Sequence, residues 1–139
     1  MEQCKIMQRI TSLRGDPWKV LEEIKSGKYF AKEAGNLKET IVEMEKLFTY
    51  LGAMKRLDKI SFDQSLARGL DYYTGMIYEI VLTDKTTELG SISGGGRYDN
   101  LIGMFCQHQI PATGGSLGIE RLFTILESKF KNKVKQNEC

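Results

Sequence analysis

The sequence has 139 residues, of which 41% are hydrophobic and 27% charged, and its net charge is +2; these proportions are typical of a soluble globular protein with one core. The small net charge does not indicate a nucleic-acid-binding surface. The chain has neither an apolar run of about 18 residues nor an N-terminal secretory signal, so we expect a cytoplasmic protein. Three scattered cysteines without CxxC spacing favour free thiols over a disulfide framework or a metal site; they are Cys4, Cys106 and Cys139.

Two short helices are predicted at the start of the chain. The first lies within residues 1–14, where apolar residues recur at helical spacing: Ile6, Ile10 and Leu13. Asp16 and Pro17 form a favourable start for the second, because aspartate caps free amides and proline fits the first helical position. Gly27 is placed to end this second helix.

A third helix is predicted over residues 37–52. Its start is similar to a capping box, with Asn36 three residues before Glu39, and Gly52 is placed to end it. An apolar stripe at spacings of three and four follows one face: Leu37, Ile41, Met44, Phe48 and Leu51. Such a stripe can bind a partner or pack on a neighbouring helix, and we favour packing. Residues 1–58 are therefore predicted to form a small helical module.

The hydrophobic period changes after the helical module. Residues 60–67 alternate in a way that predicts a strand delivering Arg68 to the end of a sheet. Residues 76–82 form the next predicted strand, and we expect it to be central because apolar residues occupy both of its faces. After a polar turn at 84–90, residues 91–93 are expected to return as the second strand of a hairpin.

The segment RGLDYYTG, at residues 68–75, carries the densest polar chemistry of the chain. It places a cation, a carboxylate and two adjacent phenols between glycines that permit tight turns. Arginine can hold a phosphate or carboxylate with two hydrogen bonds, and tyrosine adds a hydroxyl and a stacking face. The segment indicates a pocket for an anionic ligand that carries a planar polar group. The alternative is an Arg–Asp pair that ties a turn beside buried tyrosines.

A glycine run at residues 94–96 precedes Arg97, Tyr98 and Asp99. Three successive residues without side chains allow either a close approach of backbone amides to a ligand or a strained turn. The later segment GGSLG, at residues 114–118, predicts a strand whose small side chains leave room for a flat ligand.

The rest of the C-terminal half is predicted from its patterns alone. Residues 100–105 are helix-like and residues 107–113, with the single histidine His108, form a solvated loop. An amphipathic helix follows, with apolar positions at helical spacing: Ile119, Leu122, Phe123, Leu126 and Phe130. Residues 131–139 are expected to be a polar, frayed tail.

Three segments, taken in order, resemble signatures of one enzyme family: RGLDYYTG at 68–75, SGGGRYD at 93–99 and GIER at 118–121. They are similar to the two histidine-specific motifs and the third class II motif of histidyl-tRNA synthetase. The fold that this resemblance implies is α+β, a class II synthetase-like antiparallel sheet with flanking helices, preceded by a small helical module. It makes residues 59–130 part of the catalytic domain and residues 1–58 the end of a helical insertion.

The resemblance implies roles for individual residues. Arg68 is the expected catalytic residue, contacting the α-phosphate of ATP and stabilising the charge that develops there. Arg121 would contact the ATP tail near adenine, with Glu120 orienting it and Gly118 beside it. Buried hydrogen-bonding partners of the histidine ring would discriminate this substrate strongly, and the residues implied as histidine-binding are Tyr72, Tyr73, Gly94, Gly95 and Tyr98.

The reaction implied is activation of histidine by ATP to histidyl-adenylate, followed by transfer to tRNA(His). Catalysis of this kind needs positioning and electrostatics and no protein nucleophile. Mg²⁺ is expected as the counter-ion of ATP, without a protein metal site, and the complete enzyme is expected to be a homodimer with no membrane partner. The alternative is a non-catalytic synthetase-like regulator or binding module, against which the phosphate-facing Arg68 and Arg121 argue.

The chain also departs from the family pattern. No segment resembles the first or second class II motif, the loop that grips the histidine amino group, or the anticodon-binding domain. We therefore expect a fragment of the enzyme that lacks turnover by itself. Gly115 stands where relatives carry a larger apolar residue, which is expected to change the shape of the adenine side.

Overall fold

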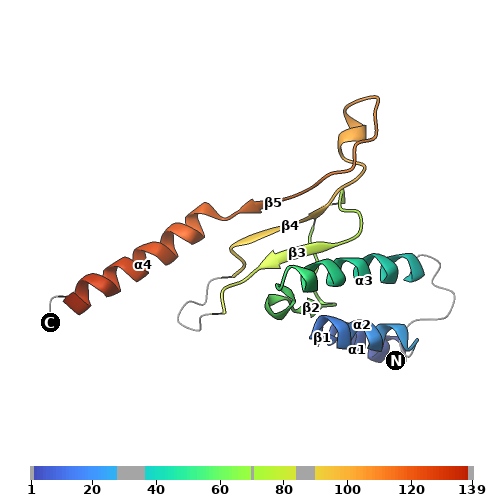
Figure 1. The fold of residues 1–139 in the computed structure, drawn as a ribbon, viewed down its shortest axis with the longest axis horizontal. Helices are drawn as coiled ribbons and strands as arrows, with labels where there is room; N and C mark the ends of the chain where they lie inside the picture. The colour runs from blue at the N-terminus through green and yellow to red at the C-terminus, as the bar shows by residue number, and fades with distance from the viewer. Residues whose placement is uncertain (1, 28–36, 70, 84–89, 138–139) are drawn as a thin grey trace. The chain divides into compact units, whose positions relative to one another are not determined.

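The computed structural model describes residues 2–27, 37–69, 71–83 and 90–137. The chain forms two compact units, Met1–Ala67 and Arg68–Cys139. Helices dominate the first unit, and the second contains an antiparallel sheet followed by a helix (Figure 1). The predicted α+β class is therefore confirmed.

The predicted N-terminal helices are present as α1 (Glu2–Thr11) and α2 (Pro17–Lys25). The side chain of Asp16 caps α2 by accepting a hydrogen bond from the Lys19 amide at 3.0 Å. Gly27 has a φ of +69°, the left-handed conformation that glycine supplies after a helix end. Both predicted boundaries of this helix are confirmed.

Helix α3 (Leu37–Ala53) ends differently from the prediction. The left-handed residue is Lys55, with a φ of 55°, rather than Gly52. The Lys55 amide donates to the Gly52 carbonyl and the Arg56 amide to the Leu51 carbonyl, each at 2.9 Å. This pair of bonds is a Schellman motif, which satisfies the last carbonyls and leaves Gly52 inside the helix. The capping residue predicted at position 36 lies outside the described residues.

The core of the first unit joins α2 to α3. Leu21 is fully buried, and Leu13, Val20 and Ile24 form a cluster. The residues packed against this cluster are Leu37, Ile41 and Phe62. Phe48 is only 2% exposed and makes edge contacts with the rings of Trp18 and Phe62, with centroids 5.7 and 5.3 Å apart. The apolar stripe of α3 thus packs within the unit, as favoured.

The strand predicted over residues 60–67 is wrong for most of its length. The short helix η1 (Leu57–Lys59) precedes it, and only β2 (Phe62–Asp63) is extended and paired. Its partner is the unpredicted strand β1 (Arg14–Gly15). The Asp63 carboxylate accepts hydrogen bonds from the amide and hydroxyl of Ser65, at 2.8 and 2.6 Å. These local bonds turn the backbone and end the strand.

The second unit contains a three-stranded antiparallel sheet of β3 (Ile77–Ile80), β4 (Ser93–Arg97) and β5 (Thr113–Leu117), in that order. The predicted hairpin and final strand are present, but the returning strand of the hairpin is residues 93–97 rather than the predicted 91–93, so the glycine run lies in the strand itself. Within this sheet β3 is an edge strand, so its predicted central place is wrong, and Ile80 and Val81 are exposed. The polar turn predicted at 84–90 falls almost entirely outside the described residues.

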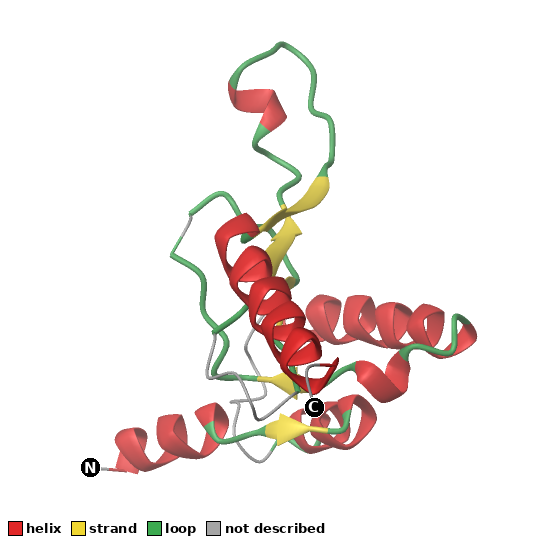
Figure 2. Cartoon of the chain, turned by 90° about the vertical axis from the view of Figure 1, so that its left-hand side faces the viewer, coloured by secondary structure: helices red, strands yellow, loops and turns green. Residues whose placement is uncertain are grey.

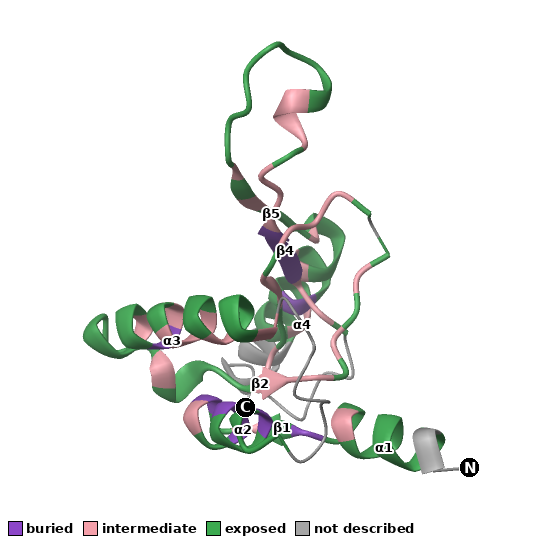
Figure 3. Cartoon of the chain, turned by 90° about the vertical axis from the view of Figure 1, so that its right-hand side faces the viewer, coloured by how far each residue is buried: buried purple, intermediate pink, exposed green. Residues whose placement is uncertain are grey.

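The central strand is the glycine run. Residues 93–96 are all buried in β4 (Figure 3), and none of its glycines has a positive φ. The strained turn that was one of the two alternatives predicted for residues 94–96 is therefore wrong. The connection from β4 to β5 is a long loop carrying the short helix η2 (Ile102–Met104), in place of the helix predicted at 100–105 (Figure 2).

Helix α4 (Ile119–Asn137) confirms the amphipathic helix and extends it. Residues up to 137 are helical, so the frayed tail predicted from 131 is wrong over this range. Most of the predicted apolar face is exposed: Ile119, Phe123, Leu126 and Phe130. Among the helices that the structure describes, none is long and apolar enough to cross a membrane.

Candidate ligand-binding site

On one face of the sheet in the second unit, three of the six paired residues are glycines. Side chains of successive strand residues point to opposite faces, and residues paired across strands share a face. Glu79 pairs with Gly94, which pairs with Ser116, while Ile77 pairs with Gly96, which pairs with Gly114. Gly94, Gly96 and Gly114 therefore form a bare floor, which we call the glycine floor.

Arg68 lies on this floor above Gly94. A Cβ atom built on Gly94 would meet the Arg68 guanidinium, with Cζ only 2.8 Å away. Arg68 Nη1 pairs with Glu79 Oε1 at 3.0 Å, and the two side chains are 22% and 31% exposed. The buried Nε of Arg68 has no hydrogen-bond partner among the described residues. A half-buried cation with a free donor is suited to an anionic ligand.

The three tyrosines predicted to bind histidine gather at the other end of the floor. The Tyr73 ring covers Gly96, where a Cβ would lie 2.8 Å from Cδ1, and the Tyr98 hydroxyl covers Gly114. The ring centroid of Tyr72 lies 4.9 Å from that of Tyr73 and 5.9 Å from that of Tyr98. The structure thus brings the adjacent pair Tyr72 and Tyr73 together with the distant Tyr98 in one aromatic cluster.

The phenol of Tyr72 has a raised pKa. Desolvation is the largest cause, followed by the neighbouring Tyr73, while Arg68 acts in the opposite direction. A phenol is already neutral at physiological pH, and the upward shift of its pKa reinforces this, so Tyr72 can both donate and accept hydrogen bonds.

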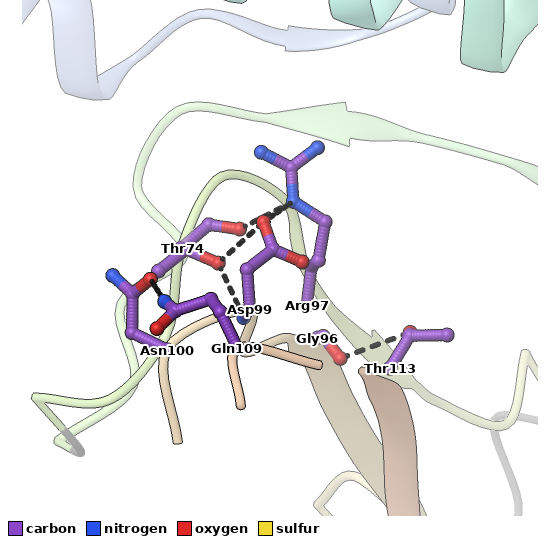
Figure 4. Close-up of polar contacts among 7 residues, drawn as sticks. All are labelled: Thr74, Gly96, Arg97, Asp99, Asn100, Gln109 and Thr113. Atoms are coloured by element: carbon purple, nitrogen blue, oxygen red, sulfur yellow. Dashed lines mark hydrogen bonds and ion pairs between the residues drawn. The ribbon is translucent and has the colours of Figure 1, made fainter. Parts of the chain in front are cut away.

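Thr74 and Asp99 connect the two tyrosine-bearing segments (Figure 4). Thr74 Oγ1 donates to Asp99 Oδ2 at 3.1 Å and accepts from the Asp99 amide at 2.9 Å. Arg97 Nε lies 2.9 Å both from the Thr74 carbonyl and from Asp99 Oδ2. Gly75, with a φ of +84°, makes room for this arginine. Thr74 is not among the predicted site residues, and its only signal in the sequence is its place directly after the tyrosine pair.

Arg121 occupies the third position on the same face. It packs over Gly118 and Gly90, with Cδ and Nη1 lying 3.6 and 3.4 Å from the Cβ positions of these glycines. Its Nη1 donates to the Ser91 carbonyl, so a backbone group orients this side chain rather than Glu120. The Gly118 amide donates to the Ile92 carbonyl at 2.8 Å, which continues the ladder between the strands.

The three groups follow one another along the sheet. The tyrosines lie over positions 96 and 114, Arg68 over position 94, and Arg121 over position 118, which is bonded to position 92. Successive same-face positions are about 7 Å apart along a strand. An aromatic end, a central cation and a second cation therefore line a single extended track.

Gly95 and Gly115 point to the opposite face. The Tyr78 hydroxyl lies against both, at 2.8 Å from the Cβ position of Gly95, and it donates to the Gly114 carbonyl at 3.4 Å. Of the predicted histidine contacts, Gly95 can thus offer only its backbone. Gly115 makes room for Tyr78 and does not face Arg121.

The remaining candidate residues are not among the groups described above. His108 is exposed, and Cys4 and Cys106 are free thiols. Cys139 is outside the described residues. Among the residues that the structure describes, no three His, Cys, Asp or Glu side chains gather in a way that would hold a metal ion.

Comparison with known proteins identifies the family of the chain. The sequence profile described as "Histidyl-tRNA synthetase" matches residues 1–122. The chain belongs to the histidyl-tRNA synthetase family. It is 50% identical over 132 residues to the cytoplasmic histidine–tRNA ligase of Oryza sativa subsp. japonica, and 44% identical over 135 residues to that of Dictyostelium discoideum. The mitochondrial histidine–tRNA ligase of Homo sapiens is 49% identical over 104 residues.

Solved structures of the histidyl-tRNA synthetase family agree with the fold. The crystal structure of histidyl-tRNA synthetase from Nostoc sp. PCC 7120 superposes with a TM-score of 0.81 at 32% identity, over 92% of this chain and 30% of that one. A Bacillus halodurans protein titled "ATP phosphoribosyltransferase regulatory subunit/histidyl-tRNA synthetase" gives a TM-score of 0.68 at 28% identity, over 85% and 29%. The alignments with the rice and Dictyostelium enzymes span 93% and 94% of this chain, but only 16% and 27% of those enzymes. The chain therefore spans less than a third of the length of these relatives.

Proposed function

We propose that the glycine floor binds histidyl-adenylate, as part of an enzyme that activates histidine with ATP and transfers it to tRNA(His). The observation that carries this proposal is the order of groups along the track, from tyrosines through Arg68 to Arg121. Histidyl-adenylate has the same order, with an imidazole at one end, an anionic phosphate in the middle and a nucleoside at the other end.

The tyrosine cluster is assigned to the histidine end. Tyr72, Tyr73 and Tyr98 provide hydroxyls and ring faces within one cluster. A substrate side chain without ring nitrogens would leave such partners without hydrogen bonds, which weakens its binding and its reaction.

Arg68 is assigned to the α-phosphate and Arg121 to the nucleotide end. In the first reaction the histidine carboxylate attacks the α-phosphorus and pyrophosphate leaves, so negative charge builds up next to Arg68. Preorganised donors at that point lower the barrier. Mg²⁺ would arrive with ATP, because Glu79, the described carboxylate beside Arg68, is already ion-paired.

Further proposals concern the complete protein. Residues 1–58 would be the end of a helical insertion and residues 59–130 part of the catalytic domain. Histidine, ATP and tRNA(His) would be its ligands, and a second copy its partner. Relatives are named both cytoplasmic and mitochondrial, and we place this protein in the cytoplasm.

A second candidate function is non-catalytic regulation. The Bacillus halodurans neighbour carries a regulatory subunit in its title. A protein that binds histidine alone needs the tyrosine cluster but has no use for Arg68 and Arg121 on the same track. The two arginines therefore favour the enzyme.

Calorimetric titration tests the proposal directly. The chain is titrated with a non-hydrolysable sulfamoyl analogue of histidyl-adenylate and, separately, with its tyrosyl counterpart. We expect binding of the histidyl analogue and at least about tenfold weaker binding of the tyrosyl analogue. Equal binding of both, or no binding by a folded sample, contradicts the proposal.

A further inference from the structure

We propose that Glu79 is a positioning residue, which holds the guanidinium of Arg68 flat on the glycine floor so that its free edge faces the phosphate. This inference rests on the proposed function and adds a residue that the three sequence motifs do not contain.

The register brings Glu79 to the place where it can act. Glu79 lies on β3 directly opposite Gly94 on β4. Because Gly94 has no side chain, the Glu79 carboxylate reaches Arg68 above the neighbouring strand, at 3.0 Å from Nη1. Any larger residue at position 94 would occupy the space that the guanidinium fills.

The contact uses one edge of the guanidinium and leaves the other free. Glu79 engages Nη1, whereas the buried Nε has no partner among the described residues. A buried donor without a partner costs about 1–3 kcal/mol. A phosphate oxygen at the Nε edge would remove that cost and complete the hydrogen bonding of Arg68.

The side chains of this ion pair are mostly buried, since only 22% and 31% of the Arg68 and Glu79 side chains are exposed. The desolvation of two buried charges offsets much of their attraction, so such a pair is weak evidence for a role in stability. An arginine side chain loses considerable rotamer entropy when it is fixed on a ligand. Fixing it beforehand lowers the cost of binding, which is the advantage that Glu79 supplies.

The direction in which ligand affinity changes when Glu79 is removed distinguishes a positioning role from simple charge repulsion. A carboxylate near a bound phosphate repels it, so removing Glu79 would strengthen binding if charge alone mattered. If Glu79 acts through Arg68, its removal weakens binding of a ligand with an anionic group at the phosphate position, such as the N-acyl sulfamate of the sulfamoyl analogue. The effect should then disappear or reverse when Arg68 is absent.

The first arm of the test needs no ligand. Rotation about the Nε–Cζ bond of Arg68 is measured by ¹⁵N NMR in the full chain, with the signal assigned by its loss in Arg68→Lys. Glu79→Gln, which keeps the shape and removes the charge, should speed this rotation at least about tenfold, and Glu79→Asp should do so less. Glu127→Gln, which breaks the exposed pair with Lys131 on α4, is the matched control and should change nothing. Unchanged rotation in Glu79→Gln overturns the inference.

The second arm measures affinity for the sulfamoyl analogue of histidyl-adenylate and for histidinol. Glu79→Gln should weaken binding of the analogue about tenfold and leave binding of histidinol unchanged. In an Arg68→Ala background, Glu79→Gln should not weaken binding of the analogue. Equal or tighter binding of the analogue by Glu79→Gln overturns the inference. If wild type binds neither probe while the rotation arm gives the expected result, the positioning contact stands and the proposed function fails.

Discussion

Thr74 and Asp99 are 25 residues apart in sequence and exchange two hydrogen bonds, from Thr74 Oγ1 to Asp99 Oδ2 at 3.1 Å and from the Asp99 amide to Thr74 Oγ1 at 2.9 Å. Tyr73 and Tyr98 are the residues immediately before each of them. The pair therefore fixes the distance between the two segments that carry the aromatic cluster.

Thr74→Val should loosen this connection without changing the size of the side chain. It removes both hydrogen bonds and leaves the Asp99 amide unpaired, at an expected cost of about 1–2 kcal/mol in the free energy of unfolding. Affinity for the histidyl-adenylate analogue should fall as well, since the tyrosines lose their mutual placement. Urea unfolding and calorimetry measure the two effects. Thr124→Val, which removes a bond within exposed α4 only, is the control, and an equal loss there would count against the interpretation.

Gly94→Ala should displace Arg68 while leaving the strand intact. The added Cβ would lie within 2.8 Å of the Arg68 Cζ atom, so the guanidinium must leave the floor. We expect at least about tenfold weaker binding of the analogue, measured by calorimetry. Gly69→Ala is the matched control for Gly94→Ala, because nothing lies within 4 Å of a Cβ atom at position 69 and the φ of Gly69 is not left-handed. Comparable losses in both variants would show that the glycine floor has no special role.

Arg68→Ala separates phosphate binding from histidine binding. A charge-assisted hydrogen bond contributes about 1.5–3 kcal/mol, so affinity for the analogue should fall about 10- to 150-fold. Binding of histidinol, which has no anionic group at the phosphate position, should be unaffected, and the far-UV circular dichroism spectrum should not change. A parallel loss for histidinol would contradict the role assigned to Arg68.

Asp63 should make the first unit sensitive to acid. Hydrogen bonds from Ser65 lower the pKa of this carboxyl below its ordinary value of 3.8, with a smaller contribution from Arg14. A pKa lowered by folding stabilises the protein above the unfolded-state pKa, and that contribution is lost as the pH falls through the folded-state pKa. Asp63→Asn should therefore be less stable than wild type at pH 7, with the difference shrinking in acid. Urea midpoints followed from pH 7 to below 3.8 test this, and a constant difference would refute it.

The sequence predicts elements well where local chemistry sets them. Asp16 and Pro17 define the start of α2, and the run of small residues at 114–118 predicts β5. The turn after Asp63 escaped prediction because a side-chain bond to Ser65 overrides the alternating pattern. Gly52 was a misleading helix end because a Schellman motif forms one turn later at Lys55.

The candidate site was only partly predictable. Motif resemblance supplied Arg68, the tyrosines and Arg121, but gave no order in space. The roles of Glu79 and Thr74 depend on partners 11 and 25 residues away, and no local pattern encodes such distances. The two faces of the glycine run became distinguishable only through the register, which assigns Gly94 and Gly96 to one side and Gly95 to the other.

The most direct measurement of the central claim is a ¹⁵N-glycine NMR titration of the chain with the sulfamoyl analogue of histidyl-adenylate. Glycines are distributed over both units and report separately on the floor and on the helices. We predict that the amide signals of Gly94, Gly96, Gly114 and Gly118 shift together, while those of Gly27 and Gly52 stay in place. Shifts confined to the helical unit, or no shift of Gly94 and Gly96 at saturating analogue, would contradict a ligand track on this face of the sheet.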